Sequence, residues 1–294
     1  MPAVPASLDA LRREIDDIDA RLHDLLMQRA SVVEQVGAAK AQAGSAGAFM
    51  RPGREAQILR RLLARHQGSL PAATVAALWR TLMTEFLRMQ APLDVAVWPG
   101  SDERAAAMLA FWDLGRGHFG PDTPMTLHDS AHQALRAVSE RPGVVAVLPT
   151  PDSGEVEPWW PLLFADGAPR IVARLPFAWR DDGHGRPPSA VVVGAFEAEA
   201  SGEDHAYIGI GLAGSASRTR LASLLEQVGL DGHIVATVGE GATSVHLAEV
   251  AGHVAADDRR LQSLASAGEG VVDRALVLGG FASQMVLDPA PPRA

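Results

Sequence analysis

The sequence predicts a multidomain protein: an all-α region of three helices, followed by an α/β region and an α+β region of ferredoxin-like order. The length of 294 residues suits two domains or three small ones, at roughly 150 residues per domain. Apolar residues recur with helical spacing before Leu93, whereas short apolar runs alternate with helical stretches after it. Near the end, the expected order is strand, helix, strand, strand, helix, strand, which is typical of a ferredoxin-like module.

The first helix is expected to run from Ser7 to about Lys40. Ser7 is a suitable N-cap, with Asp9 in the first turn. Apolar residues follow the three-and-four spacing of a coiled-coil seam at Leu8, Leu11, Ile15, Ile18, Leu22 and Leu25. Such a helix spans about 50 Å at ~1.5 Å per residue, more than a small domain can cover. We therefore expect a second copy of the chain to supply partner helices.

Two shorter helices complete the first region, residues 1–93. A loop rich in glycine and alanine, 43–52, separates the first helix from a second one at about residues 53–66. A third helix is expected to end near Gln90, before Pro92. Its apolar residues include Val75, Leu78, Trp79, Leu82, Met83 and Phe86.

The remaining chain is expected to divide into an α/β region, 94–188, and a ferredoxin-like region, 189–294, after the polar stretch 181–188. Outside the ferredoxin-like module, strands are expected at 94–98, 144–149, 170–177 and 190–196, with helices at 102–114 and 129–140. Within the module, strands are expected at 205–212, 233–238, 244–251 and 275–278, with helices at 216–228 and 257–267.

Composition excludes several classes of protein. There is no cysteine, so disulfides, thiolate metal sites and a cysteine nucleophile are excluded. The longest apolar runs fall short of the ~18 residues of a membrane helix, and residues 1–10 lack the pattern of a signal peptide. Residues 94–294 hold 26 acidic against 14 basic residues, which argues against a nucleic-acid partner. We expect a cytoplasmic protein with neither nucleic-acid nor membrane partners.

Charged residues lie where the helices should be apolar. Arg29 and Lys40, the only lysine in the chain, continue the seam of the first helix, and Arg12 flanks its other end. Glu55 and Gln90 share the apolar faces of the second and third helices. Each residue alone is explained by a charge that reaches solvent over a buried stem. Together, with Arg51 and Arg54 nearby, they leave positive charge that a small dianion would satisfy.

These residues lie in segments that resemble a known family. The segments ALRREIDDIDARLHDLLMQRASVVEQVGAAK (10–40) and RPGREAQIL (51–59) resemble the all-helical chorismate mutases. The similarity covers residues 7–93 and is closest to the mutase domain of bifunctional chorismate mutase–prephenate dehydratases. It implies an intertwined homodimer, or a larger homo-oligomer, of three-helix subunits that converts chorismate to prephenate in phenylalanine and tyrosine biosynthesis, without metal or cofactor.

The resemblance also implies roles for individual residues. Arg12 reaches one substrate carboxylate from the opposite subunit, and Arg29 binds the other. Lys40 and Gln90 donate to the ether oxygen, while Glu55 holds the ring hydroxyl. The pocket is flanked by Arg51, which stands where family members often carry an acid, and by Arg54. It is narrowed by Phe86, at a position usually held by a smaller residue.

The C-terminal two-thirds resemble a prephenate dehydratase domain followed by an amino-acid-binding ACT domain. GVVAVLPTPDSGEVEPWWPLLF (143–164) is similar to a dehydratase segment, and VHLAEVAGHVAADDRRLQSL (245–264) to the second half of an ACT domain. The dehydratase signatures are missing, however, and Ser189 is the one candidate to replace the catalytic threonine. The sequence therefore predicts an inactive dehydratase-like domain and a region open to a small-molecule effector or a protein partner.

Three functions follow, in order of preference. The first is chorismate mutase, an isomerase, with a C-terminal appendage for regulation, stability or partner contact. The second is a divergent bifunctional mutase–dehydratase that depends on Ser189. The third is a regulatory protein without catalytic activity, built on a mutase fold, against which the set of Arg12, Arg29, Lys40, Glu55 and Gln90 counts.

Overall fold

The computed structural model describes residues 7–42, 50–102, 104–180, 187–241, 244–268 and 270–287. Most of the expected loop 43–52 and of the expected linker 181–188 lies outside these residues, because 43–49 and 181–186 are not described. The three expected helices are present as α1 (Leu8–Gln42), α2 (Pro52–Ala64) and α3 (Ala72–Arg88). No helix in the described ranges combines the length and the apolar character needed to cross a membrane.

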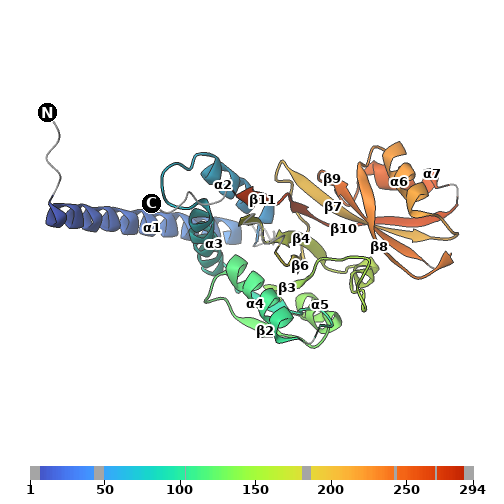
Figure 1. Ribbon diagram of the computed structural model, residues 1–294, viewed down its shortest axis with the longest axis horizontal. Coiled ribbons are helices and arrows are strands. Elements are labelled where there is room, and N and C mark those ends of the chain that lie inside the picture. Colours follow the sequence, from blue (N-terminus) through green and yellow to red (C-terminus); the bar gives the residue numbers. More distant parts are fainter. Residues whose placement is uncertain are drawn as a thin grey trace.

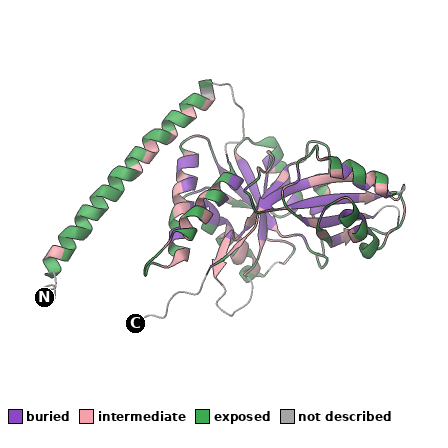
Figure 2. Cartoon of the chain, turned by 90° about the horizontal axis from the view of Figure 1, so that it is seen from above, coloured by how far each residue is buried: buried purple, intermediate pink, exposed green. Residues whose placement is uncertain are grey.

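Helix α1 extends well beyond the rest of the chain (Figures 1 and 2). The Ser7 hydroxyl caps it by accepting the N–H of Ala10 at 3.2 Å, as the sequence predicts. Its seam residues are 44–63% exposed: Leu8, Leu11, Ile15, Ile18, Leu22 and Leu25. The first half of the helix is therefore not covered by the rest of the described chain. Only its later part turns half-buried residues, among them Arg29, Gly37 and Lys40, toward the body.

The rest of the chain is built around one mixed sheet. Its helices are α4 (Ala105–Phe119), α5 (Ala131–Glu140), the 3₁₀ helix η1 (Trp160–Phe164), α6 (Arg218–Gln227) and α7 (Arg259–Ala267). Its strands are β1 (Asp94–Val97), β2 (Met125–Leu127), β3 (Val144–Pro149), β4 (Arg170–Leu175), β6 (Ala190–Gly194), β7 (Asp204–Leu212), β8 (Gly232–Val238), β9 (Val245–Ala251) and β10 (Val272–Ala282). A separate parallel pair joins β5 (Ala178–Arg180) to β11 (Met285–Leu287).

The strand order in the sheet is β2-β1-β3-β6-β4-β10-β7-β9-β8. Strands β2, β1 and β3 are parallel, as α/β connections require, and β7-α6-β8-β9-α7-β10 is the expected ferredoxin-like module with antiparallel strands. The short strands β2, β5 and β11 and helix η1 were not expected, because three to five residues carry too little periodicity to be recognised in a sequence.

Alternating residues of the strands feed two cores. In β1, Val95 and Val97 pack with Phe119 of α4 and Leu87 of α3, whereas Ala96 faces the side of α5 and η1. The second core continues under the ferredoxin-like strands, where helices α6 and α7 cover the opposite face. Figure 2 shows buried residues, in purple, on the strands of both halves of the sheet.

The sheet does not break at the boundary expected after residue 188. Strand β6, which falls in the third expected region, pairs with β3 and β4 of the second. Strand β4 then pairs with β10 at a single register point, Ile171 with Gly279. Gly279 has φ of +145°, and a Cβ there would lie 2.0 Å from the Ile171 carbonyl oxygen. Glycine is thus required where the two halves of the sheet meet.

Replacement of Gly279 by alanine should destabilise the protein by about 3 kcal/mol or more, because the side chain meets fixed backbone at a φ that alanine avoids. The matched control is Gly211→Ala on neighbouring β7, where the nearest atom would lie 3.8 Å from the new Cβ. Urea unfolding followed by circular dichroism measures both. Equal midpoints for the two variants would contradict the requirement.

Candidate functional site

Arg29 provides the clearest sign of an anion site in the helical region. Its guanidinium carbon lies 4.2 Å from the centre of the Phe86 ring, so α1 and α3 meet at this pair. The Nη1 atom of Arg29 is buried and has no hydrogen-bond partner among the described residues, and burial lowers the pKa of the guanidinium. A buried guanidinium nitrogen without an acceptor costs free energy that an anionic ligand would recover. The large Phe86 ring thus forms a stacking surface for Arg29.

Gln90 and Lys40 lie beside this pair. Gln90 follows Phe86 by one turn and donates from Nε2 to the Phe86 carbonyl oxygen at 3.0 Å. A Cβ on Gly37 of α1 would lie 3.6 Å from Cγ of Gln90, so the two helices approach closely here. Lys40 is half-buried one turn beyond Gly37 on the face of α1 that carries Arg29. The structure therefore brings Arg29, Phe86 and Gln90 together and places Lys40 next along the same face.

Glu55 has a partner that the sequence analysis did not identify. Arg80 of α3 donates from Nη1 to Oε2 of Glu55 at 2.7 Å, and the two side chains are only 9% and 17% exposed. Burial lowers the pKa of Arg80, and the Glu55 charge opposes that effect. Arg80 falls between Ala76 and Met83 on the buried side of α3. Like Glu55, Arg80 is a charged residue on the apolar face of a helix, and this pattern could have identified it in the sequence.

Arg80 also faces the C-terminal region. Its guanidinium lies 5.3 Å from the centre of the Phe177 ring. Burial lowers the pKa of His118, and the charge of Arg80 lowers that pKa further. Arg80, His118 and Phe177 line a cavity of about 260 Å³ between α3, α4 and the β5–β11 pair. The ion pair of Glu55 and Arg80 is thus part of the contact between the helices and the sheet.

The remaining predicted residues lie apart from Arg29. Arg12 is exposed on the first half of α1, where it is paired with Asp9 at 3.4 Å. Arg51 and the backbone N–H of Arg54 both bind the carboxylate of Glu199, from the loop between β6 and β7. None of these contacts involves Arg29, Lys40, Phe86 or Gln90.

A second cleft, of about 810 Å³, lies between the α/β and ferredoxin-like parts. Its lining includes the ion pair of Arg174 and Glu249, with Nη1 to Oε1 at 3.2 Å, and the aromatic rings of Trp179 and Phe281. Ser189 is not among the residues that line this cleft. Its hydroxyl accepts from Thr150 at 2.8 Å and donates to the Leu175 carbonyl at 3.2 Å.

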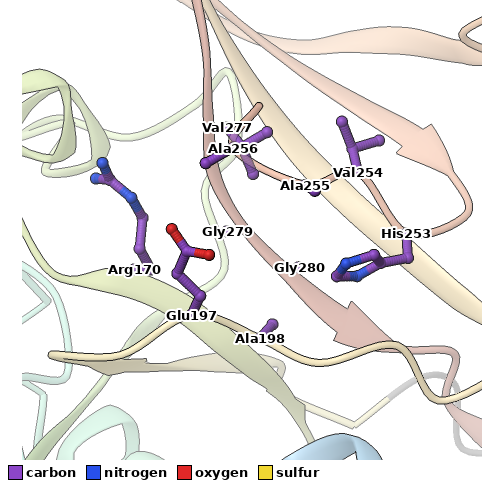
Figure 3. Close-up of a pocket in the computed structure, with 10 residues that line it drawn as sticks. All are labelled: Arg170, Glu197, Ala198, His253, Val254, Ala255, Ala256, Val277, Gly279 and Gly280. Carbon is purple, nitrogen blue, oxygen red and sulfur yellow. The ribbon is translucent and has the colours of Figure 1, made fainter. Parts of the chain in front are cut away.

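Figure 3 shows a third, small cavity of about 50 Å³ next to β10, with Arg170 and Glu197 on one side and His253 on the other. Pockets for small ligands measure roughly 300–1,000 Å³, so this cavity is too small for a substrate. Among the described residues, no group of three or more histidine, aspartate or glutamate side chains could hold a metal ion.

The helical region that contains Arg29, Phe86 and Gln90 matches a known family. Residues 11–91 fit the model described as chorismate mutase type II. This segment is similar to a chorismate mutase domain. This agrees with the three helices, and the match includes Arg12, Arg29, Lys40, Arg51, Arg54, Glu55, Phe86 and Gln90.

Curated relatives carry this domain within longer chains. Over 145 residues, 48% of this chain, the sequence is 34% identical to a bifunctional chorismate mutase/prephenate dehydratase of Pseudomonas aeruginosa and 32% identical to one of Stutzerimonas stutzeri. Each match covers 38% of the relative, so the chain spans well under half of their length. A solved prephenate dehydratase from Streptococcus mutans superposes on 66% of this chain and 100% of its own, with a TM-score of 0.44 and 12% identity.

The loop before η1 carries a titratable group that should make stability depend on pH. Burial, then the charge of Asp152, raises the pKa of Glu155 to about 8, from 4.5, while a hydrogen bond from Trp159 opposes the shift. Between these values the folded state holds a proton that the unfolded state releases. The stability that protonated Glu155 contributes to the folded state is thus fully present below pH 4.5 and is lost as the pH rises through 8.

We therefore expect Glu155→Gln to flatten the decline in unfolding midpoint between pH 5 and pH 9, whereas exposed Glu157→Gln leaves the decline unchanged. Urea unfolding at each pH provides the measurement. A wild-type midpoint that rises over this range, or two variants with the same slope, would contradict the assignment.

Proposed function

We propose that this chain is a cytoplasmic chorismate mutase, an isomerase that converts chorismate to prephenate in aromatic amino-acid biosynthesis. The observation that carries the proposal is the buried Arg29 nitrogen without a partner, in a domain of the chorismate mutase family. Chorismate has two carboxylates and an ether oxygen, and Arg29 offers paired donors for one of the carboxylates.

The reaction needs no nucleophile, proton transfer or metal. The rearrangement is unimolecular, so the protein has to hold a compact, reactive conformer and stabilise negative charge that develops on the ether oxygen. Lys40 supplies an ammonium for that oxygen. Gln90 supplies an amide N–H, because its NH₂ group has two hydrogens and only one is used by the Phe86 carbonyl.

Glu55 suits the ring hydroxyl even though it is paired. Arg80 binds its Oε2, and a carboxylate has a second oxygen that can accept the hydroxyl proton. The pair also keeps Glu55 from being a lone buried charge, which would be costly beside a dianionic substrate. We assign Arg80 the task of orienting Glu55.

The site is completed by a second subunit in this proposal. The exposed seam of α1 has coiled-coil spacing, and a second copy would bury it. Arg12 beside that seam would then reach the partner's Arg29 pocket, as the family resemblance implies. This accounts for the distance of Arg12 from the other predicted residues within one chain.

The bifunctional alternative is favoured by the two relatives, which are both bifunctional chorismate mutase/prephenate dehydratases. Against it, the Ser189 hydroxyl beside the cleft is already engaged: it accepts from Thr150 and Arg174 and donates to the Leu175 carbonyl. We therefore assign residues 94–294 to support and regulation of the mutase, with the cleft beside Arg174 open to a small-molecule effector or a partner. Phenylpyruvate formed from prephenate, and lost in Ser189→Ala, would support the alternative instead.

Replacement of Lys40 by alanine should lower kcat for chorismate about 10²–10³-fold, because one donor to the developing oxyanion is removed. Loss of chorismate absorbance measures the rate. Lys40→Arg should fail to restore it, since a guanidinium does not replace a compact ammonium here. Arg21→Ala, an exposed cation on the same helix, is the control and should keep the wild-type rate. No turnover in the wild type would favour the non-catalytic regulator.

Leu22→Asp in the α1 seam should produce monomers in analytical ultracentrifugation and abolish turnover, because a charge cannot be buried between paired helices. Ala20→Asp, on the opposite face of the helix, should remain a dimer or larger oligomer with full activity. If sites are shared between subunits, mixing inactive Arg12→Ala and Lys40→Ala subunits restores turnover. A fully active Leu22→Asp monomer would exclude the shared site.

A further inference from the structure

A loop of the C-terminal region holds the start of helix α2. The loop, residues 195–203, connects β6 to β7 and carries Glu199. One oxygen of this carboxylate accepts from Nη2 and Nε of Arg51, at 2.7 and 3.0 Å, and the other accepts the backbone N–H of Arg54 at 2.9 Å. These contacts cross 145 or more residues of sequence.

Helix α2 needs such a carboxylate. Its N-cap residue, Arg51, makes no side-chain cap, and the first N–H groups of a helix attract negative charge. Glu199 supplies both the acceptor and the charge from outside the helix. Gly53 permits the approach, since a Cβ there would lie 2.6 Å from the Glu199 carbonyl oxygen. The helix start and the loop are therefore fitted to each other.

The next turns of α2 are held by the same region. Arg60 donates to the Ser201 hydroxyl at 2.9 Å and to the carbonyl oxygens of Glu203 and Ser283 at 2.8 and 3.1 Å. Its guanidinium also lies 5.7 Å from the centre of the Phe177 ring. The helix that carries Arg54 and Glu55 is thus attached at both ends to the C-terminal region.

We infer that Glu199 is a positioning residue of the mutase site, supplied by the C-terminal region. It neutralises Arg51 and fixes the first turn of α2, from which Arg54 and Glu55 project. The inference rests on the proposed mutase function.

The role predicts a specific kinetic effect. Glu199 acts on α2, whereas the donors to the ether oxygen, Lys40 and Gln90, lie on α1 and after α3. Glu199→Gln should therefore raise KM for chorismate about tenfold, which is the typical effect of losing a charge-assisted hydrogen bond. The same variant should leave kcat within about twofold of the wild type. Glu197→Gln, an equal change in the same loop, is the matched control and should leave both constants unchanged.

The experiment uses the full chain, with initial rates of chorismate loss and a thermal unfolding scan for each variant. A KM increase confined to Glu199→Gln, with an unfolding temperature close to that of the wild type, supports the positioning role. An unchanged KM, an equal effect of Glu197→Gln, or a fall in kcat that follows lost stability overturns that role alone. A wild type that does not convert chorismate overturns the proposed function and the role of Glu199 with it.

Discussion

The contact between β4 and β10 is the constraint on which the rest of the structure depends. Gly279 brings its backbone so close to Ile171 that two smaller sheets become one of nine strands. The core below β1 and β3 consequently continues under the ferredoxin-like strands, and neither half closes by itself. The same continuity sets the loop after β6 and the segment after β10 next to one another, where Arg60 binds both. Helix α2 is held at that place.

The helical domain is consequently attached to the sheet unevenly. Helices α2 and α3 are anchored through buried contacts, with Leu59 and Met83 packed on Phe177 and Leu87 in the core beneath α4. Helix α1 meets the body only over its later part, and its first half offers an apolar seam. One face of the domain is thus packed against its own chain, while the seam of α1 is left exposed within the described residues. A C-terminal region attached in this way can influence the site without contributing a catalytic group.

Arg80, which is buried, and Arg29, which is half-buried, have different surroundings. Arg80 is compensated by Glu55, and both are nearly removed from water, so this charge is part of the fold. Arg29 is stacked on Phe86, and its Nη1 atom has no hydrogen-bond partner among the described residues, so in the proposed function an anionic ligand compensates it. Arginines on two neighbouring helices therefore differ in role: one is part of the fold, and the other is proposed to bind a ligand. Only the surroundings, a carboxylate in one case and an aromatic ring in the other, distinguish them.

By itself, the sequence determined the three helices, the ferredoxin-like order and the position of Arg29 against the third helix, because these depend on local periodicity and on charges that interrupt it. It could not show that Glu55 pairs with Arg80 or that Glu199 caps α2, since both contacts join segments far apart in the chain. The sequence could not predict the pairing of β4 with β10 at Gly279 for the same reason. Periodicity specifies which face of an element is buried, whereas the partner of that face is decided by the tertiary packing.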